Sequence, residues 1–203
     1  MPERKRILLE GNIGAGKSTV GATLKASGLF EFIEEPVNEW KNGFASNMLD
    51  VFYHDMNRWA FTFQLVTFIT RKKTWKEILS CTDHPRVILE RSIFTDRYVF
   101  APNLHRLGVI EDNEWQVYCR LWDFVADNND IEPDCILYLR TPADVCLERI
   151  HRRGRGEETG ITLDYLRQLE DLHDEWLQNR SCAILLDGIK HWTAEEIIEI
   201  VEI

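Results

Sequence analysis

Eight consecutive residues near the N-terminus have the types and spacing of a phosphate-binding loop. They follow the pattern G-x-x-x-x-G-K-[ST] and read Gly11, Asn12, Ile13, Gly14, Ala15, Gly16, Lys17 and Ser18. Glycines let backbone N–H groups close around phosphate oxygens, and the start of a following helix adds partial positive charge. In this pattern the lysine reaches the β- and γ-phosphates, and the serine hydroxyl ligates Mg²⁺. The loop therefore predicts that the chain binds a nucleoside triphosphate.

The segments on either side of this loop are those that the motif needs. Residues 7–9 are an apolar run typical of a buried strand, Thr19 opens a helical pattern that continues to Ala26, and Gly28 is placed to end it. A glycine-rich turn that matched the pattern by chance would lack this context. We therefore prefer the phosphate-binding interpretation.

Charged residues follow two further strand-like segments. Pro36 disfavours helix at Glu35 and keeps that residue extended, so that its carboxylate projects from the end of a strand. A carboxylate beside a transferring phosphate could accept the proton of an attacking hydroxyl, although a solvated loop carboxylate fits the sequence equally. After the next strand, Glu90 is expected to face the Mg²⁺ of the loop, and Arg91 to face anionic or hydroxyl groups of a substrate.

A long helical region over residues 48–79, with a break at 55–57, carries two polar residues in an apolar setting. Gln64 and Arg71 are seven residues apart and therefore share one helix face. The helix around them is apolar nearly all round, which predicts burial, and buried polar side chains need partners. A nucleobase edge would supply them. Alternatively, Arg71 starts an exposed basic end, and Gln64 makes a hydrogen bond in the core.

The segment after Arg91 adds two candidate binding residues. Asp96 and Phe100 are four residues apart, which places a carboxylate and a ring on one face of the helix expected there.

Four arginines stand between positions 149 and 155 of this otherwise acidic chain, namely Arg149, Arg152, Arg153 and Arg155. A glycine-containing lid over about residues 152–160 would bring guanidinium groups onto the transferred phosphoryl group and exclude water. A solvated charged loop is the alternative.

Composition limits the class of protein. The chain has 203 residues, of which 44% are hydrophobic and 29% charged, and a net charge of −10. The length and the lack of a linker or repeat predict a single domain over residues 1–203. The acidic balance argues against nucleic acid as a partner, and no apolar stretch approaches the length of a membrane span.

The thiols and the N-terminus predict a compartment. Five cysteines without a C-x-x-C pair, and a start that runs directly into the first strand, favour a cytoplasmic protein with reduced thiols.

Short apolar runs alternate with amphipathic segments, which predicts an α/β fold. A mostly parallel sheet of about five strands, with helices on both faces, is the P-loop kinase fold, and its ligands gather at the carboxyl ends of the strands. The loop over residues 186–190, which contains Asp187, lies at the same edge and could touch the base of the phosphate donor. The expected strands are Arg6–Glu10, Phe30–Glu34, Val87–Glu90, Cys135–Leu139 and Cys182–Leu186.

These segments, in their order, resemble the deoxynucleoside kinase family, which contains deoxycytidine, deoxyguanosine and insect multisubstrate kinases. The resemblance runs from residue 7 to about residue 187. It is carried by the loop from Gly11 to Thr19, by Glu35-Pro36-Val37 with Trp40, by Tyr53 and Trp59 with Phe63-Gln64, by Glu90-Arg91-Ser92, and by Arg153-Gly154-Arg155 with Glu158.

The resemblance implies roles on the acceptor side. Glu35 would deprotonate the 5′-hydroxyl of a deoxynucleoside, and Arg91 would hold that hydroxyl. Tyr53 and Glu158 would bind the 3′-hydroxyl, and Gln64 would pair with the base edge. The base itself would be sandwiched between Phe100 and either Phe63 or Trp40.

On the donor side, the resemblance implies ATP or another nucleoside triphosphate together with Mg²⁺. Its phosphates would contact the loop and Lys17, Arg149, Arg153 and Arg155, and the metal would lie near Ser18 and Glu90.

The pair formed by Arg71 and Asp96 resembles the deoxycytidine and deoxyguanosine branch, because thymidine-accepting relatives typically have uncharged residues at these places. The resemblance therefore implies a preference for purine deoxynucleosides (deoxyadenosine or deoxyguanosine) or deoxycytidine over thymidine. It further implies a homodimer, for which the aromatic stripe of Trp115, Tyr118 and Trp122 on a helix predicted over Asp112–Asp127 is a candidate interface, with core packing as the alternative. A deoxynucleoside triphosphate is a candidate feedback inhibitor.

Two other classes compete with this interpretation. A nucleoside monophosphate kinase of the thymidylate type would share the loop and the lid, but should offer an arginine where Glu35 stands. The second class is a GTP-driven switch or a regulatory nucleotide-binding module. A GTPase would need N-K-x-D and D-x-x-G motifs, and the sequence contains neither.

Overall fold

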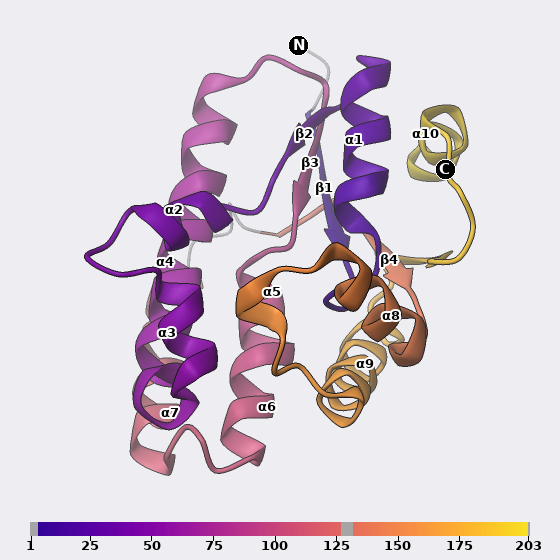
Figure 1. The fold of residues 1–203 in the computed structure, drawn as a ribbon. Helices are drawn as coiled ribbons and strands as arrows, with labels where there is room; N and C mark the ends of the chain where they lie inside the picture. Colours follow the sequence, from indigo (N-terminus) through magenta and orange to yellow (C-terminus); the bar gives the residue numbers. More distant parts are fainter. Residues whose placement is uncertain (1–3, 127–131, 203) are drawn as a thin grey trace.

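The computed structural model describes residues 4–126 and 132–202, which form a layered α/β fold (Figure 1). The strands are β1 (Lys5–Glu10), β2 (Glu31–Ile33), β3 (Arg86–Glu90), β4 (Cys135–Arg140) and β5 (Ala183–Asp187). The helices are α1 (Lys17–Ser27), α2 (Val37–Asn42), α3 (Met48–His54), α4 (Met56–Cys81), α5 (Ile93–Thr95), the π-helix η1 (Asp96–Phe100), α6 (Ala101–Arg106), α7 (Asp112–Ala126), α8 (Ala143–Arg153), the 3₁₀-helix η3 (Gly156–Glu158), α9 (Leu163–Leu177) and α10 (Ala194–Val201).

The five strands form one parallel sheet in the order β2-β3-β1-β4-β5. This confirms the predicted sheet. The predicted bounds of all five strands differ from the structure by one residue at one end or at both; for example, β2 is confined to Glu31–Ile33 and β5 covers Ala183–Asp187. Strand pairing sets these limits, and the sequence pattern alone does not contain that information.

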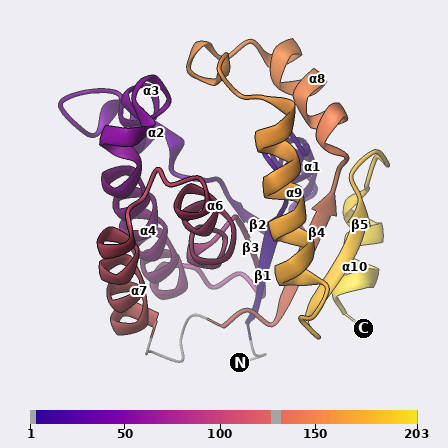
Figure 2. The ribbon, with the colours of Figure 1, turned by 90° about the horizontal axis from the view of Figure 1, so that it is seen from below.

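Helices cover both faces of the sheet (Figures 1 and 2), which explains why β1 is an unbroken apolar run. Ile7 and Leu9 pack with Leu24 of α1 and with α10 on one face, whereas Leu8 faces Phe68 of α4 and the helices α8 and α9 on the other. All three β1 residues have no exposed surface. The central strand therefore fixes the loop that follows it.

A separate apolar cluster builds the wall beside the carboxyl ends of the strands. Trp40 of α2, Phe52 of α3 and Phe63 of α4 belong to this cluster. The predicted break in the long helical region lies at Asp55, whose carboxylate accepts a hydrogen bond from the N–H of Arg58 (3.1 Å) and so begins α4. The wall thus has separate helices that can carry different side chains to one place.

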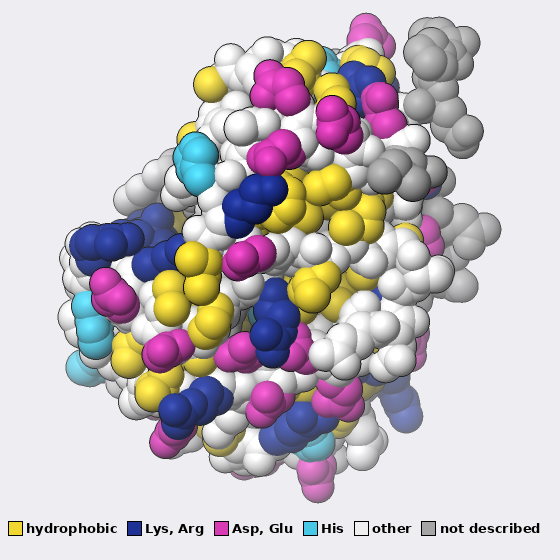
Figure 3. Space-filling view, turned by 90° about the vertical axis from the view of Figure 1, so that its right-hand side faces the viewer, with side chains coloured by type: hydrophobic (Ala, Val, Ile, Leu, Met, Phe, Trp, Pro, Cys, Tyr) yellow, Lys and Arg dark blue, Asp and Glu magenta, His cyan; other side chains and the backbone are white. Residues whose placement is uncertain are grey.

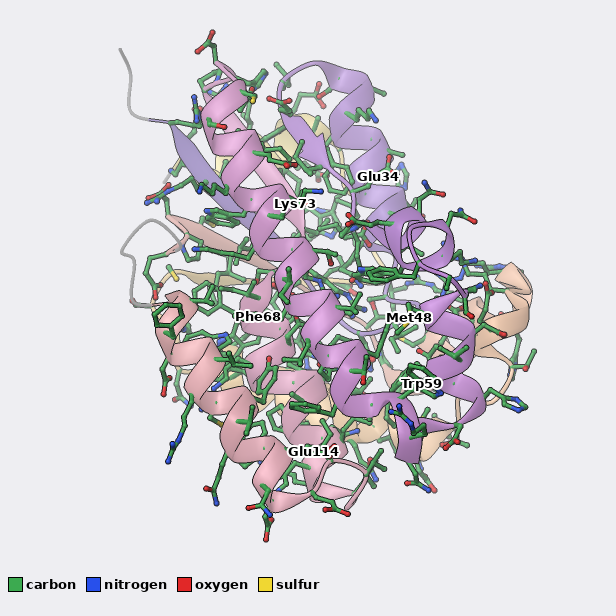
Figure 4. The ribbon with its side chains drawn as sticks, turned by 90° about the vertical axis from the view of Figure 1, so that its left-hand side faces the viewer. Glu34, Met48, Trp59, Phe68, Lys73 and Glu114 are labelled. Atoms are coloured by element: carbon green, nitrogen blue, oxygen red, sulfur yellow. The ribbon has the colours of Figure 1, made fainter. Side chains whose placement is uncertain are left out.

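The aromatic stripe of α7 faces the chain's own core, so its prediction as a subunit interface is wrong. Tyr118 is fully buried beside Phe68, and Trp122 packs edge-on against Phe94. Other apolar side chains of α7, a helix that Figure 4 shows beside α4, are exposed. They are Val117 (48% exposed), Leu121 (39%) and Phe124 (81%). The position Asp127, where the predicted helix ended, lies outside the described residues.

The surface gives two further observations. Among residues 4–126 and 132–202, no helix is both long and apolar enough to cross a membrane. On the side of the molecule in Figure 3, acidic side chains are interspersed among the lysines and arginines.

Candidate active site

A cavity of about 710 Å³ opens where the carboxyl ends of the strands meet the wall formed by α2, α3 and α4. This volume is in the usual range for a small-molecule site. The predicted site residues that line it are Ile13, Gly14, Ala15, Gly16, Lys17, Ser18, Thr19, Glu35, Trp40, Tyr53, Phe63, Gln64, Arg71, Glu90, Arg91, Asp96, Phe100, Arg149, Arg153, Arg155 and Glu158. Segments up to 145 residues apart in the sequence therefore converge on one space.

Three predicted residues do not line this cavity. The amide of Asn12 is buried and donates to the backbone oxygen of Leu166 (2.8 Å), so it anchors the loop from behind. Gly11 contributes its backbone oxygen to Lys17. The carboxylate of Asp187 accepts from the N–H of Ile189 (2.8 Å) and shapes the turn whose next residues do reach the cavity.

The phosphate-binding loop requires glycine where the backbone turns. Gly14 has φ +77°, and a Cβ atom there would come within 2.5 Å of the backbone oxygen of Cys146. The Lys17 ammonium folds back over the loop and donates to the backbone oxygens of Gly11 (3.0 Å) and Asn12 (2.8 Å). Burial lowers the pKa of Lys17 to about 8. A bound polyphosphate would give this buried cation the negative partner that favours its charged form.

Ser18 and Glu90 form a pair of oxygen donors beside the loop. The Ser18 hydroxyl donates to both carboxylate oxygens of Glu90, at 3.2 and 3.3 Å. Burial raises the pKa of Glu90, and Lys17 acts in the opposite direction. One carboxylate and one hydroxyl fit the way Mg²⁺ is held in phosphate sites, where the ion keeps several waters and takes further oxygens from the substrate phosphates.

Arg91 is held in a backbone conformation that few non-glycine residues adopt. Its φ is +62°, which is the sole positive value at a non-glycine position among the described residues. The turn is fixed by the Arg91 N–H, which donates to the backbone oxygen of Leu9 (3.0 Å), and by a capping box that begins at Ser92. As a result the guanidinium lies 4.7 Å above the ring of Phe100, and its Nε atom lies 3.8 Å from Oε1 of Glu35. Local strain at such a position points to a functional constraint.

Arg71 bridges two carboxylates inside the cavity. Its guanidinium donates to Oε1 of Glu35 and to Oδ1 of Asp96. Burial opposes the ionisation of Glu35, but Arg91, Arg71 and Lys17 outweigh it and hold the pKa of Glu35 below its usual value. Burial raises the pKa of Asp96 despite the contact with Arg71. The alternative of an exposed basic helix end is wrong for Arg71, because its side chain is only 5% exposed.

Two buried acceptor atoms on the cavity wall have no hydrogen-bond partner within the described part of the chain. They are Oε1 of Gln64 and Oδ2 of Asp96. A buried polar atom left without a partner costs about 1–3 kcal/mol. Gln64 therefore does not serve a hydrogen bond of the core through this oxygen, and both atoms are positioned for a ligand that donates.

The rings predicted to hold a base come from the apolar wall. Phe63 stacks on Phe52 with centroids 4.7 Å apart and meets Trp40 edge-on at 5.7 Å. The indole N–H of Trp40 donates to the hydroxyl of Thr70 (2.8 Å), which fixes the ring. Phe100 reaches the cavity from η1, beneath Arg91.

The arginine-rich segment lines the cavity and contacts the phosphate-binding loop. Arg149 donates to the backbone oxygen of Ala15 in the loop (2.7 Å) and to that of Gly188 (3.0 Å). Arg153 and Arg155 pair instead with Glu158, whose carboxylate is nearly buried. The lid residues Arg153, Arg155 and Glu158 line the same cavity as the phosphate-binding loop, whereas the direct contact with the loop is made by Arg149 of α8.

Thr67 and Tyr165 are two of the cavity-lining residues that sequence reasoning missed. Thr67 lies on the same face of α4 as Gln64 and Arg71, and its hydroxyl donates to Oδ1 of Asp96 (3.1 Å), so the helical spacing could have identified it. Tyr165 belongs to α9, and burial raises the pKa of its hydroxyl to about 12. No pattern in the sequence separated Tyr165 from the other side chains of that helix.

A phosphate-binding loop, a buried carboxylate across the cavity and an arginine-rich lid define a phosphotransferase of the P-loop kinase fold. Comparison with protein families then identifies it further, because the family model described as "Deoxynucleoside kinase" matches residues 7–202. The chain belongs to the deoxynucleoside kinase family. It is a deoxynucleoside kinase that uses ATP as phosphate donor in nucleotide salvage. The competing assignments as a nucleoside monophosphate kinase or a GTPase are therefore excluded.

Individual relatives agree with the family. A probable deoxycytidine kinase of fowlpox virus is 41% identical, with 87% of this chain and 73% of the relative covered. Deoxycytidine kinase 2 of Gallus gallus is 36% identical (92% and 78% covered). Mitochondrial thymidine kinase 2 of Homo sapiens is also 36% identical (86% and 65% covered).

Glu10 is a buried carboxylate directly before the phosphate-binding loop. Its two oxygens accept from the hydroxyls of Ser92 (2.7 Å) and Thr95 (2.5 Å), and so tie β1 to the start of α5. Burial raises the pKa of Glu10 from 4.5 to about 7, although both hydroxyls act to lower it.

This raised pKa predicts a pH-dependent contribution to stability. A carboxyl group whose pKa is higher in the folded chain stabilises the fold below pH 4.5, and this contribution is lost as the pH rises through 7. Glu10→Gln removes the ionisation, so the free energy of unfolding of the variant, relative to the unchanged protein, should rise by roughly 2 to 3 kcal/mol between pH 5 and pH 8. Urea unfolding at both pH values measures it. Glu199→Gln, an exposed glutamate of α10, is the matched control, and an equal difference for Glu10→Gln at the two pH values would contradict the assignment.

Proposed function

We propose that this kinase transfers the γ-phosphate of ATP to the 5′-hydroxyl of deoxynucleosides whose bases carry an exocyclic amino group, with deoxycytidine foremost. The observation that carries the proposal is the pair of buried acceptors without partners, Oε1 of Gln64 and Oδ2 of Asp96. An exocyclic amine donates hydrogen bonds and would satisfy them.

The same atoms select against thymidine, which presents a carbonyl oxygen where cytosine presents its amine. The amide of Gln64 can turn either its oxygen or its nitrogen to a base, so it tolerates both edges. The ionised Asp96 carboxylate cannot, because both of its oxygens are acceptors, and with Oδ1 held by Arg71 and Thr67 it offers the base the acceptor Oδ2. Relatives named as deoxycytidine kinases support deoxycytidine as the first choice among the amine-bearing deoxynucleosides.

The proposed general base is Glu35. It lies at the carboxyl end of the sheet near Arg91, and the cations around it keep it ionised, as an acceptor of the 5′-hydroxyl proton must be. Arg91 is proposed to hold that hydroxyl. Tyr53 and Glu158, which line the same cavity, are proposed to bind the 3′-hydroxyl of the sugar.

The base is proposed to lie among Phe100, Phe63 and Trp40, whose rings line the same cavity as Gln64 and Asp96. Stacking on aromatic faces would hold the base in place, and the polar atoms would choose among bases.

The donor phosphates are proposed to lie on the loop, within reach of Lys17, Arg149, Arg153 and Arg155. Mg²⁺, held by Ser18 and Glu90, would neutralise charge on the β- and γ-phosphates. The arginines and Lys17 would stabilise the charge that develops as the phosphoryl group moves.

Three further proposals concern partners and compartment. A homodimer would use the exposed apolar stripe of Val117, Leu121 and Phe124 on α7, with a second copy of the chain as its occupant, as the family resemblance implies. A deoxynucleoside triphosphate could inhibit by spanning the acceptor pocket and the phosphate loop, which belong to one cavity. A cytoplasmic location is supported by the five cysteines, all of which are free.

Glu35→Gln tests the general base. The variant should lose about 10²–10⁴-fold in turnover, because the amide cannot accept the hydroxyl proton, while the Kd for deoxycytidine stays within about threefold. Steady-state kinetics and calorimetry measure the two quantities. Glu34→Gln changes the neighbouring carboxylate, which is 70% exposed, and should leave turnover near that of the unchanged enzyme. Unchanged turnover in Glu35→Gln would refute the role.

Arg71→Met combined with Asp96→Ala tests base selection. Removing both charges together avoids leaving Asp96 buried without Arg71, and Glu35, which also loses its contact with Arg71, keeps Arg91 at 3.8 Å. The ratio of kcat/KM for thymidine to that for deoxycytidine should rise by roughly ten- to a hundredfold, the scale of one hydrogen bond to a charged group. An unchanged ratio would remove both residues from the base pocket. Asp96→Ala alone, which leaves Arg71 with one partner fewer, is the comparison that shows the pair acts as a unit.

A further inference from the structure

Two neighbouring glutamates in η3 point in opposite directions. Glu158 faces the cavity, is 5% exposed, and pairs with Arg153 and Arg155. Glu157 faces away from the cavity, toward α2 and α3. Figure 1 shows this orange segment after α8 crossing in front of the sheet toward α3.

Glu157 makes two polar contacts with that wall. Its Oε1 atom lies 2.6 Å from the ammonium of Lys41, in the last turn of α2, and accepts a hydrogen bond from the amide of Asn47 at 3.1 Å. The side chains of Lys41 and Glu157 are 29% and 15% exposed, so the ion pair is largely shielded from water. The contact with Lys41 lowers the pKa of Glu157 to about 2, which keeps the pair ionised at any assay pH.

The side chain of Asn47 is held in one orientation by hydrogen bonds that do not involve the lid. Its Oδ1 atom accepts from the N–H groups of Leu49 and Asp50, both at 3.1 Å, and so caps α3. The amide nitrogen is therefore left to donate outward, to Glu157. A preoriented donor loses little side-chain entropy when it binds, in contrast to an exposed pair of long side chains.

The wall that receives Glu157 also carries acceptor-site residues. Trp40 is adjacent to Lys41, and α3, which Asn47 caps, contains Phe52 and Tyr53. The two contacts of Glu157 therefore connect the lid to the helices that carry residues assigned to the deoxynucleoside, whereas the contact with the phosphate loop is made by Arg149 of α8, before the lid.

We propose that Lys41, Asn47 and Glu157 are positioning residues that hold η3 against the α2–α3 wall, so that Glu158 reaches the sugar of the bound deoxynucleoside. None of the three lines the cavity. The inference rests on the proposed role of Glu158 in the acceptor site. It predicts that the contact of Glu157 with Lys41 and Asn47 strengthens the binding of the deoxynucleoside and leaves the binding of ATP unchanged.

Asn47→Asp is the sharpest test. Aspartate keeps the helix cap of α3 but replaces the amide donor with a carboxylate that repels Glu157. The KM and the calorimetric Kd for deoxycytidine should rise by roughly three- to tenfold, with the KM for ATP within twofold and kcat not reduced. Lys41→Met should act in the same direction. Lys73→Met, at an exposed lysine of α4 (Figure 4), is the matched control and should change neither constant.

Rescue separates positioning from damage to the fold. Lys41→Glu combined with Glu157→Lys reverses the ion pair and should restore the KM for deoxycytidine to within about twofold, although each single reversal raises it. Equal rises in KM for both substrates, a fall in kcat alone, or unchanged constants in Asn47→Asp would overturn the proposal. The proposed function and this proposal can fail separately, because the binding measurement needs no chemistry. If the unchanged enzyme does not phosphorylate deoxycytidine but the variants bind it with a weaker Kd, the proposed function is rejected and the positioning role is kept.

Discussion

The buried bridge from Asp96 through Arg71 to Glu35 is the interaction on which the rest of the site depends. The Arg71 side chain is 5% exposed and that of Asp96 1%, so each charge is tolerated only because the other is present. Removing one partner from such a pair typically costs 3–5 kcal/mol. The bridge also joins two tasks. One end of Arg71 orders the Asp96 carboxylate, which is proposed to face the base, and the other end holds the Glu35 carboxylate, which is proposed to take the hydroxyl proton.

The parallel sheet makes this bridge possible. β1, β2 and β3 end at one edge and deliver the phosphate loop, Glu35 and Arg91 to a common space. The central helix α4 brings Gln64, Thr67 and Arg71 to the same space on a single face. Under the proposed roles, the strand ends would hold the phosphates and the attacking hydroxyl, and α4 with η1 would hold the base.

Local patterns predicted much of this arrangement. The phosphate loop, the parallel sheet and the shared face of Gln64 and Arg71 follow from spacing and periodicity, which depend on neighbours in sequence. The conformation of Arg91 and the contact of Asn47 with Glu157, 110 residues away, depend on how elements meet in space, and no local signal encodes them. The aromatic stripe of α7 was ambiguous for the same reason, because core and interface use the same residue types.

Competition among the four deoxynucleosides tests the central claim most directly. The unchanged enzyme would receive equal, subsaturating amounts of deoxycytidine, deoxyadenosine, deoxyguanosine and thymidine with ATP and Mg²⁺, and the monophosphates would be quantified at early times. If the Arg71–Asp96 pair reads an exocyclic amine, the amine-bearing products dominate, deoxycytidine monophosphate first, and thymidine monophosphate is the least abundant. Thymidine monophosphate formed as fast as the others, or faster, would contradict the account.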